Sequence, residues 1–98
     1  MTLPILDVHP EAVVEARKAR QWYADKGMVV AEAFMVELDE AVAKILNNPE
    51  RWPAHTHGTR RYLLRRFPFS IVYRFRNEVV LVVAFAHARR KPGYWAKR

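Results

Sequence analysis

The chain has 98 residues, of which 51% are hydrophobic and 12% aromatic, and it contains no cysteine. This length and apolar content predict one folded domain spanning residues 1–98 and exclude a disordered chain. Without cysteine there is no disulfide, thiolate metal site or cysteine nucleophile. No stretch is apolar enough to cross a bilayer and no basic signal region opens the chain, so we expect a cytoplasmic protein without membrane contact.

The charge is divided unevenly along the chain. The formal net charge is +7, but the first fifty residues carry five basic and nine acidic side chains. The remaining residues carry twelve basic side chains and one acidic side chain, Glu78. A basic half joined to an acidic half predicts a surface directed at phosphate groups or at an acidic protein segment.

Residues 3–8 form a short apolar run that predicts a strand. Pro10 follows at a position suited to the first turn of a helix, where the missing N–H has no partner to lose. Small and apolar side chains then recur at helical spacing, namely Ala12, Ala16, Ala19 and Tyr23. This spacing predicts an amphipathic helix over residues 11–26 that ends at Gly27.

A second apolar stripe predicts another helix, which ends at the stop signal Asn47-Asn48-Pro49. The stripe consists of Val30, Phe34, Leu38, Ala41 and Ile45. We expect the two helices to form an antiparallel hairpin. We also expect their acidic side chains on solvated faces: Glu11, Glu15, Glu32, Glu37, Asp39 and Glu40.

Residues 50–59 are rich in Pro, His, Gly and Thr and predict a loop. The pattern then becomes two-residue alternation, which predicts strands over residues 60–66, 69–76 and 79–86. The links are short enough for hairpins, and the last strand, apolar throughout, should be central. The sequence therefore predicts an α+β fold with an N-terminal strand, a helical hairpin and an antiparallel three-strand meander, with both helices on one face of the small sheet.

Arginine dominates the basic half, where it supplies ten of the twelve basic side chains. Alternation along a strand would place Arg61 and Arg65 on one face and Arg60 and Arg66 on the other. One interpretation is a solvated edge strand that charge protects from aggregation. The other is anion binding together with Arg74 and Arg76, because the planar guanidinium suits phosphate and carboxylate groups.

The segment 87–95 follows the last predicted strand and mixes basic with aromatic residues. Arg89, Arg90 and Lys91 with Tyr94 and Trp95 resemble a pattern that grips nucleic acid by charge and stacking. Alternatively, the two aromatic residues fold back over the end of the core. For Trp95 we favour this covering role, and for Arg89 and Lys91 a binding role.

Histidine occurs at two places where chemistry is conceivable. His87 could act as a general acid or base, although a histidine at the end of a strand is more often simply hydrogen-bonded. His55 and His57 are spaced like metal ligands but lack a third ligand, so we interpret them as part of a surface loop. The sequence thus predicts no metal site and no cofactor.

Two segments of the basic half have a distinctive residue order, Phe67-Pro-Phe-Ser-Ile-Val-Tyr-Arg74 and Ala86-His-Ala-Arg-Arg-Lys-Pro-Gly-Tyr-Trp95. Weaker similarity lies at His9-Pro-Glu-Ala12, Trp22-Tyr23 and Asn48-Pro-Glu50. Together these segments resemble the RelE/ParE superfamily of toxins from bacterial type II toxin–antitoxin modules. The resemblance covers nearly the whole chain. It implies the same element order, a role in plasmid stabilisation, and neutralisation by a small, partly acidic antitoxin whose C-terminal segment wraps the toxin.

The superfamily contains two mechanisms, and the resemblance leaves open whether this chain is an enzyme. RelE-like members are mRNA interferases that cleave mRNA on the ribosome; this implies phosphate and transition-state contacts for Arg61, Arg65 and Arg89, with proton transfer by His87 or Tyr94. ParE-like members inhibit DNA gyrase and cut no RNA. A plain nucleic-acid-binding module would explain the charge but not the tail motif.

The match to the cleaving branch is partial. Ser70 stands where that branch usually has arginine, and Leu63 falls where another lysine is expected. We therefore expect a gyrase inhibitor, with the mRNA interferase as the alternative. For either target, gyrase or the ribosome with mRNA, the expected contact residues are Arg61, Arg65, Arg74, Arg89, Arg90, Lys91 and Trp95.

Overall fold

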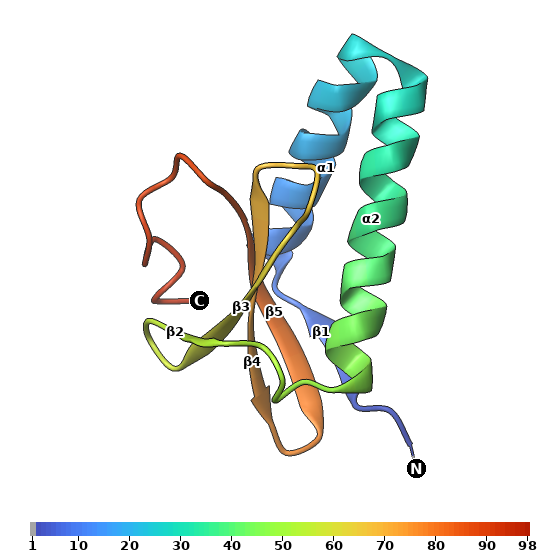
Figure 1. The fold of residues 1–98 in the computed structure, drawn as a ribbon. Coiled ribbons are helices and arrows are strands. Elements are labelled where there is room, and N and C mark those ends of the chain that lie inside the picture. The colour runs from blue at the N-terminus through green and yellow to red at the C-terminus, as the bar shows by residue number, and fades with distance from the viewer. Residues whose placement is uncertain (1) are drawn as a thin grey trace.

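The computed structural model describes residues 2–98 and confirms the predicted α+β arrangement. Two antiparallel helices lie on one side of a twisted sheet (Figure 1). In the described part of the chain no helix is long and apolar enough to span a membrane. The elements in chain order are β1 (Ile5–Val8), α1 (Pro10–Lys26), α2 (Met28–Asn47), β2 (Ala54–His55), β3 (Thr59–Leu63), β4 (Phe69–Arg76) and β5 (Val79–His87).

The helical hairpin forms where the periodicity predicts it. α1 begins after His9, whose Nδ1 accepts a hydrogen bond from the backbone N–H of Glu11 at 3.1 Å. This capping contact and Pro10 at the first position match the sequence signal for a helix start. The buried face of α1 consists of Ala12, Ala19 and Tyr23, and that of α2 of Ala31, Phe34, Glu37, Leu38, Ala41 and Ile45.

The sheet has five strands in the order β1-β5-β4-β3-β2. β1 pairs with β5 in parallel and every other pair is antiparallel. The expectation that residues 79–86 form the central strand was wrong, because β4 lies in the middle and β5 lies beside it. The turn between them contains Asn77 and Glu78, both with positive φ, as a tight hairpin requires.

A β-bulge in β5 interrupts the alternation of its side chains and places the consecutive residues Val83 and Ala84 on the same face. Val72 pairs with Ala84 and Tyr73 with Val82, so Val83 has no partner in β4. Phe85 and Val82 join the core under the helices, whereas Val83 and Ala84 join a second apolar cluster on the other face. Both faces of β5 are therefore buried, which explains its continuous apolar sequence.

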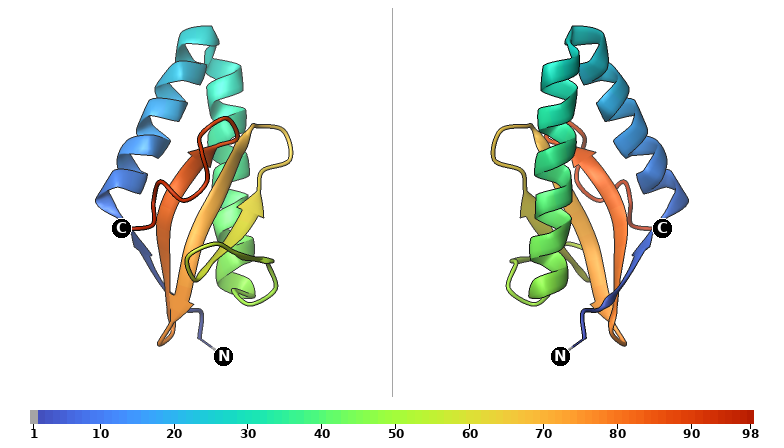
Figure 2. Two further views of the ribbon diagram at one scale, coloured as in Figure 1. Left: turned by 90° about the vertical axis from the view of Figure 1, so that its left-hand side faces the viewer. Right: turned by 90° about the vertical axis from the view of Figure 1, so that its right-hand side faces the viewer.

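The C-terminal segment, residues 88–98, covers the face of the sheet that the helices leave open. Figure 2 shows this tail crossing in front of the sheet with the helices behind it. Trp95 joins Val72, Val83, Ala84 and Ala86 in the second cluster. The sheet is thus covered on one side by a helical hairpin and on the other by eleven residues without regular structure. We call the two sides the helix face and the tail face.

Candidate functional site

Trp95 fixes the tail to the sheet. It is only 2% exposed and packs on the second apolar cluster, as the covering interpretation predicts. The ring of His55 lies at 5.4 Å from the Trp95 ring. Burial lowers the pKa of His55, and the nearby charges of Arg61 and His57 lower it further. Since Trp95 is buried, it contacts a partner only if the tail moves.

Glu15 of α1 holds the tail from the side. Its carboxylate accepts hydrogen bonds from Arg90 Nη1 at 3.1 Å and Arg98 Nη1 at 2.9 Å, and from the backbone N–H of Phe85 at 3.1 Å. The prediction that Glu15 lies on a solvated face was wrong. The sequence carries a signal for this burial, because Glu15 is three residues after Ala12 and four before Ala19, both of which are buried.

Arg74 holds the other side of the tail. Its guanidinium donates to the backbone carbonyl of Arg98 at 3.2 Å and to that of His57 at 3.3 Å. The loop containing His57 therefore borders the tail, and its imidazole lies close to Gly93. Arg74, expected to contact a target, is half-buried and used within the molecule.

Arg61 lies on the tail face. It pairs with Val72 in the sheet and lines a shallow depression with His55, Ser70 and Trp95. Two residues further along β3, Leu63 pairs with Ser70 of β4, and the Leu63 side chain is 60% exposed. The two departures from the RNA-cleaving pattern are thus neighbours on one surface.

The ring of His87 packs on the helix face. His87 pairs with Phe69, and the two rings meet edge to face at 5.0 Å. Phe69 in turn packs on Tyr23 and Phe34 under the helices. The Nδ1 atom of His87 accepts a hydrogen bond from the backbone N–H of Arg89 at 3.0 Å. His87 also lines the shallow depression that contains Arg61, Ser70 and Trp95, so the two residues border one hollow although the His87 ring packs on the helix face.

Arg65 lies on a third surface, near α2. β3 ends at Leu63, so Arg65 and Arg66 belong to the loop before β4 and not to the strand expected over residues 60–66. Arg65 lines a depression with Glu37 and Lys44 of α2. The expectation that Arg61 and Arg65 share a face was wrong, because alternation ends where the strand ends.

Glu37 fixes that loop. Its carboxylate accepts hydrogen bonds from the backbone N–H groups of Arg65 and Arg66, and from Arg66 Nε at 3.2 Å. Burial raises the pKa of Glu37, but these donors and the Arg66 charge outweigh it and hold the pKa below its ordinary value. Glu37 was predicted on a solvated face and is only 8% exposed. Like Glu15, it stands three residues after one buried position, Phe34, and four before another, Ala41.

Tyr94 lies against two arginine side chains of the tail, Arg90 and Arg98. The guanidinium carbons of Arg90 and Arg98 lie 3.5 Å and 5.1 Å from the centre of its ring. Its hydroxyl is buried, and burial together with the adjacent Glu15 carboxylate raises its pKa well above the ordinary value. A phenol in this setting is poorly suited to proton transfer near neutral pH.

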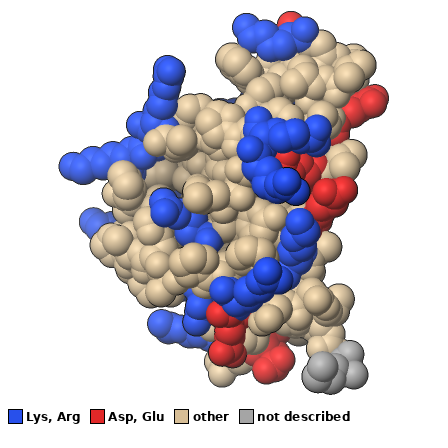
Figure 3. Space-filling view, viewed as in Figure 1, with Lys and Arg blue, Asp and Glu red and all other residues tan. Residues whose placement is uncertain are grey.

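Arg89 and Lys91 are the exposed cations of the tail's outer turn. Among residues 2–98 neither side chain forms an ion pair, whereas Arg90 and Arg98 are both engaged by Glu15. In Figure 3 basic side chains project from the side of the tail and across the middle of the molecule. Acidic side chains gather mainly along the side of α2. Near α2 acidic and basic side chains lie next to one another, as the Glu37–Arg66 ion pair also shows.

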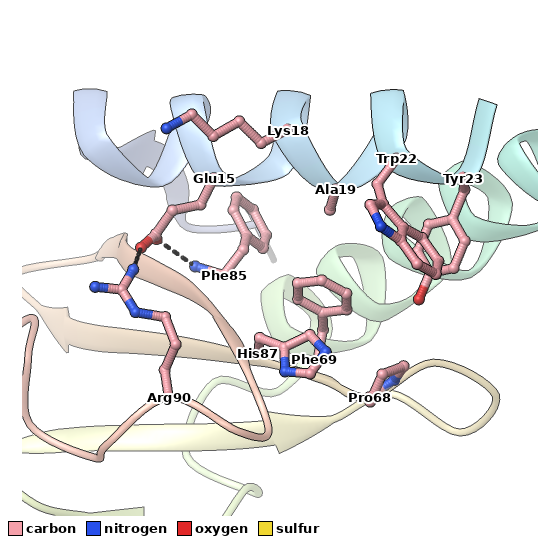
Figure 4. A pocket seen from close by; sticks show the side chains of 10 residues that line it. All are labelled: Glu15, Lys18, Ala19, Trp22, Tyr23, Pro68, Phe69, Phe85, His87 and Arg90. Atoms are coloured by element: carbon pink, nitrogen blue, oxygen red, sulfur yellow. Dashed lines mark hydrogen bonds and ion pairs between the residues drawn. The ribbon is translucent and has the colours of Figure 1, made fainter. Parts of the chain in front are cut away.

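An apolar pocket opens between α1 and the end of the sheet where β5 leads into the tail (Figure 4). Its volume is about 410 Å³. Its lining includes the aromatic side chains of Trp22, Tyr23, Phe69 and Phe85, with Glu15, His87 and Arg90 toward the tail. Trp22 is 57% exposed although it borders this pocket. No local sequence pattern predicts this pocket, because its walls join α1 to the distant strands β4 and β5.

The sequence over residues 6–92 matches the family model of the ParE toxin of the type II toxin–antitoxin system parDE. No curated protein matches the chain. The fold resembles that of the chromosomal ParDE system from P. aeruginosa, with a TM-score of 0.77 at 18% identity over 89% of this chain and 98% of that one. A mutant of the E. coli toxin RelE in the free state gives a TM-score of 0.64 at 24% identity, covering 90% of this chain and 86% of that one. The isolated E. coli RelE toxin gives 0.63 at 23% identity, covering 93% and 90%.

Proposed function

Because the chain belongs to the ParE toxin family of type II toxin–antitoxin systems, we propose that it inhibits DNA gyrase by binding and does not cleave RNA. The observation that carries this proposal is that Arg65 is separated from Arg61 and that His87 and Tyr94 are already engaged within the molecule. Arg61 lies on the tail face, His87 on the helix face and Arg65 beside α2. The proposed action needs no cofactor and takes place in the cytoplasm, where gyrase works.

RNA cleavage by attack of a 2′-hydroxyl needs a base, an acid and a cation around one phosphate. General acid–base catalysis requires each group within hydrogen-bond reach of the proton it moves. Stabilisation of the negatively charged transition state requires donors already directed at one point. Arg61 and His87 line one shallow depression, but the His87 ring packs on Phe69 and its Nδ1 already accepts a hydrogen bond from the Arg89 N–H. Tyr94, the other proton-transfer candidate, has a buried hydroxyl with a raised pKa.

The Leu63–Ser70 pair supports the same proposal. These two positions are where the RNA-cleaving branch is expected to carry basic side chains, and they are adjacent across β3 and β4. With an apolar and a small neutral side chain there, the cations of that depression are Arg61 and Arg90, and Arg90 is paired with Glu15. One guanidinium provides less charge than stabilisation of a pentacoordinate phosphate would use.

Binding to a protein target requires only exposed, complementary groups, and the tail provides them. Arg89 and Lys91 project from a segment that Trp95 and Glu15 hold in place, so little ordering is needed on binding. Exposed cations on a fixed support suit an acidic protein surface and accelerate association with it. We therefore assign Arg89 and Lys91 to the contact with gyrase.

Two assays with the purified toxin test the proposal. We expect accumulation of cleaved DNA in complex with gyrase, and no codon-resolved cleavage of mRNA on programmed ribosomes. The double variant Arg89→Glu/Lys91→Glu should weaken gyrase inhibition by about tenfold or more, because like charges then face the target. Arg76→Glu is the matched control, since Arg76 is also exposed but lies at the opposite end of β4.

Cleavage of mRNA by the unmodified toxin would overturn the proposal. The variant Ser70→Arg sharpens the test, because it restores the basic side chain expected in the cleaving branch. For a ribonuclease this change should raise activity, whereas for a gyrase inhibitor it should be neutral or harmful.

A further inference from the structure

We propose that the histidine hairpin, residues 54–59, holds the tail on the sheet in a pH-dependent way: the tail stays docked while His55 is neutral and opens when His55 takes up a proton. Figure 1 shows β2 of this hairpin and the tail on the same side of the sheet. The opening of the tail is independent of the target. Its consequence for gyrase rests on the proposed function, because the tail carries Arg89 and Lys91.

The backbone of the hairpin is fixed, so its two histidines have defined positions. Its turn contains His57 and Gly58, with positive φ values of 60° and 70°. The hydroxyl of Thr59 donates to the carbonyl of Thr56 at 2.6 Å, and the guanidinium of Arg74 donates to the carbonyl of His57 at 3.3 Å. The hairpin therefore meets the tail as a preformed support.

Two contacts join the hairpin to the tail. The His55 ring lies 5.4 Å from the Trp95 ring, with 32° between the two planes. The Nε2 atom of His57 lies 3.1 Å from the point that a Cβ atom on Gly93 would occupy. Gly93 has a φ of 92°, so both its backbone and the neighbouring imidazole favour glycine there. Residues 93–95 of the tail are thus fitted to the two histidines.

A proton on His55 would enter a basic environment. Within residues 2–98, no acidic side chain lines the depression that His55 borders. Glu15, which holds the tail elsewhere, is already paired with Arg90 and Arg98. The charged or titratable side chains around the hairpin are Arg60 and Arg61 of β3, Arg74 and Arg76 of β4, His87 of β5, Arg90 of the tail and His57 of the hairpin itself.

Burial and charge act on His55 in the same direction. Burial lowers its pKa below the ordinary value of 6.5, and the charges of Arg61 and His57 lower the pKa further. The indole face of Trp95 attracts a cation and so opposes this shift, but the net direction is downward. When the tail opens, His55 loses the Trp95 cover and regains water. The open state therefore binds a proton more readily than the docked state, and acidification favours opening.

The pH range of the effect follows from that difference. Well above about pH 6.5, His55 is neutral in both states and docking has its full strength. As the pH falls below this value, the open state takes up the proton first. Docking then weakens until the docked state is protonated as well. One proton changes the opening equilibrium by at most about tenfold per pH unit.

Hydrogen exchange of the tail amides measures the opening. In the docked tail the amides of Ala96 and Arg98 donate to the carbonyls of Gly93 and Trp95, so these two amides report on docking. Between about pH 7.5 and 5.5, which lies above the ordinary range of carboxyl groups, their protection should fall by more than about twofold after correction for the intrinsic rate. It should stay within the hundredfold limit of about one proton over two pH units.

Two variants make this test specific. His55→Phe keeps a ring beside Trp95 and suits a strand but binds no proton, so protection should no longer depend on pH. His9→Asn is the matched control, because it removes a histidine that does not border the depression and keeps a side-chain acceptor at the start of α1. This control should keep the full pH dependence. Persistence of the dependence in His55→Phe would overturn the proposal and assign the effect to His57 or His87.

A second measurement follows the proton itself and does not depend on the folding of His55→Phe. Titration of the His55 imidazole by nuclear magnetic resonance should give a pKa below the ordinary value in the unmodified protein. Trp95→Ala should raise this pKa, because proton binding and tail docking influence each other reciprocally. A purely structural contact between the rings predicts no such change. The same His55 titration curve in both proteins would overturn the proposal.

Binding to gyrase separates this proposal from the proposed function. The affinity of the unmodified toxin for gyrase should fall between about pH 7.5 and 5.5, whereas that of His55→Phe should stay within about twofold. An equal fall in both proteins would overturn the link between the tail and the target. If the unmodified toxin does not bind gyrase, the proposed target is wrong, while exchange and titration still decide whether His55 controls the tail.

Discussion

The two faces of the sheet are covered in different ways. On the helix face the two helices bury a continuous core that includes Phe34, Ile45, Ile71 and Tyr73. On the tail face Trp95 is fully buried on small and branched residues, and the partly buried Tyr94 packs against the same cluster. Polar contacts from Glu15 and Arg74 complete this second cover. The helix face thus depends on apolar area and the tail face on a few separate anchors.

This difference teaches where the molecule can change without losing its fold. Stability varies across a structure, and segments with few apolar contacts open at lower cost than the core. The tail has few such contacts, and it carries the exposed cations and one side of the apolar pocket. The proposed contact with gyrase therefore sits on the less strongly held cover, supported by a more strongly held core.

The largest expected effect is on the helix face. Phe34→Ala should lower the free energy of unfolding by about 3–5 kcal/mol, because a buried ring in contact with Tyr23, Phe67 and Phe69 leaves a cavity. Urea denaturation followed by circular dichroism measures this loss. A loss below about 1 kcal/mol would mean that the helices contribute less to stability than the comparison states.

On the tail face the corresponding truncation should act locally. Trp95→Ala removes a fully buried side chain and should weaken tail docking by about 1.5–3 kcal/mol. The tail should then open while the core stays folded, so trypsin should cleave faster at Arg89, Arg90 and Lys91. If the variant instead unfolds as a whole at a lower urea concentration, without faster cleavage of the tail, the tail and the core form one cooperative unit. That result would contradict separate opening of the tail.

The sequence predicted the element order, the helical hairpin, the turn at Asn77 and the covering role of Trp95. These features follow from local signals, namely periodicity, helix stops and turn residues. It did not predict β2, the parallel pairing of β1 with β5, or which strand lies in the middle, because pairing between distant segments leaves no local pattern.

The candidate site was harder to predict than the fold. Glu15 and Glu37 were assigned to solvent by residue type, although their spacing placed each among buried positions of its helix. Each carboxylate joins a helix to a basic segment elsewhere in the chain, one to the tail and one to the loop before β4. Such contacts depend on tertiary structure, and a charged residue within an apolar stripe is the available signal for them.

A smaller effect should follow from weakening the Glu15 anchor. Glu15→Gln removes the two ion pairs but leaves an amide oxygen that can accept from the Phe85 N–H, so tail docking should weaken by about 1–1.5 kcal/mol. Hydrogen exchange of the tail amides should accelerate by about tenfold. Glu11→Gln, on the same helix but exposed, is the control. Equal exchange rates in both variants would show that Trp95 alone holds the tail.

The smallest expected effect concerns Glu37, which belongs to the helix face. Through Glu37 the free energy of unfolding should depend on pH. The pKa of Glu37 in the folded protein is held below its ordinary value of 4.5, chiefly because the donors from Arg65 and Arg66 outweigh the effect of burial. A lowered pKa contributes stability that is complete above the ordinary value and is lost as the pH falls through the folded value. Glu37→Gln should therefore cost about 1 kcal/mol near neutral pH, and the difference from the unmodified protein should shrink as the solution is acidified.

Urea denaturation at a series of pH values from neutral to about pH 3 measures this dependence, and the acidic end of the series is where the two proteins should converge. Glu40→Gln provides the matched control, since Glu40 is exposed on the same helix and its substitution should change stability by less than about 0.5 kcal/mol. The tail should not respond to Glu37→Gln, because within residues 2–98 the hydrogen bonds of the Glu37 carboxylate go to the loop before β4. A constant difference across the whole series would show that the Glu37 contact does not depend on its charge. Faster exchange of the tail amides in Glu37→Gln would show that the two faces are coupled through the sheet, which contradicts their independence.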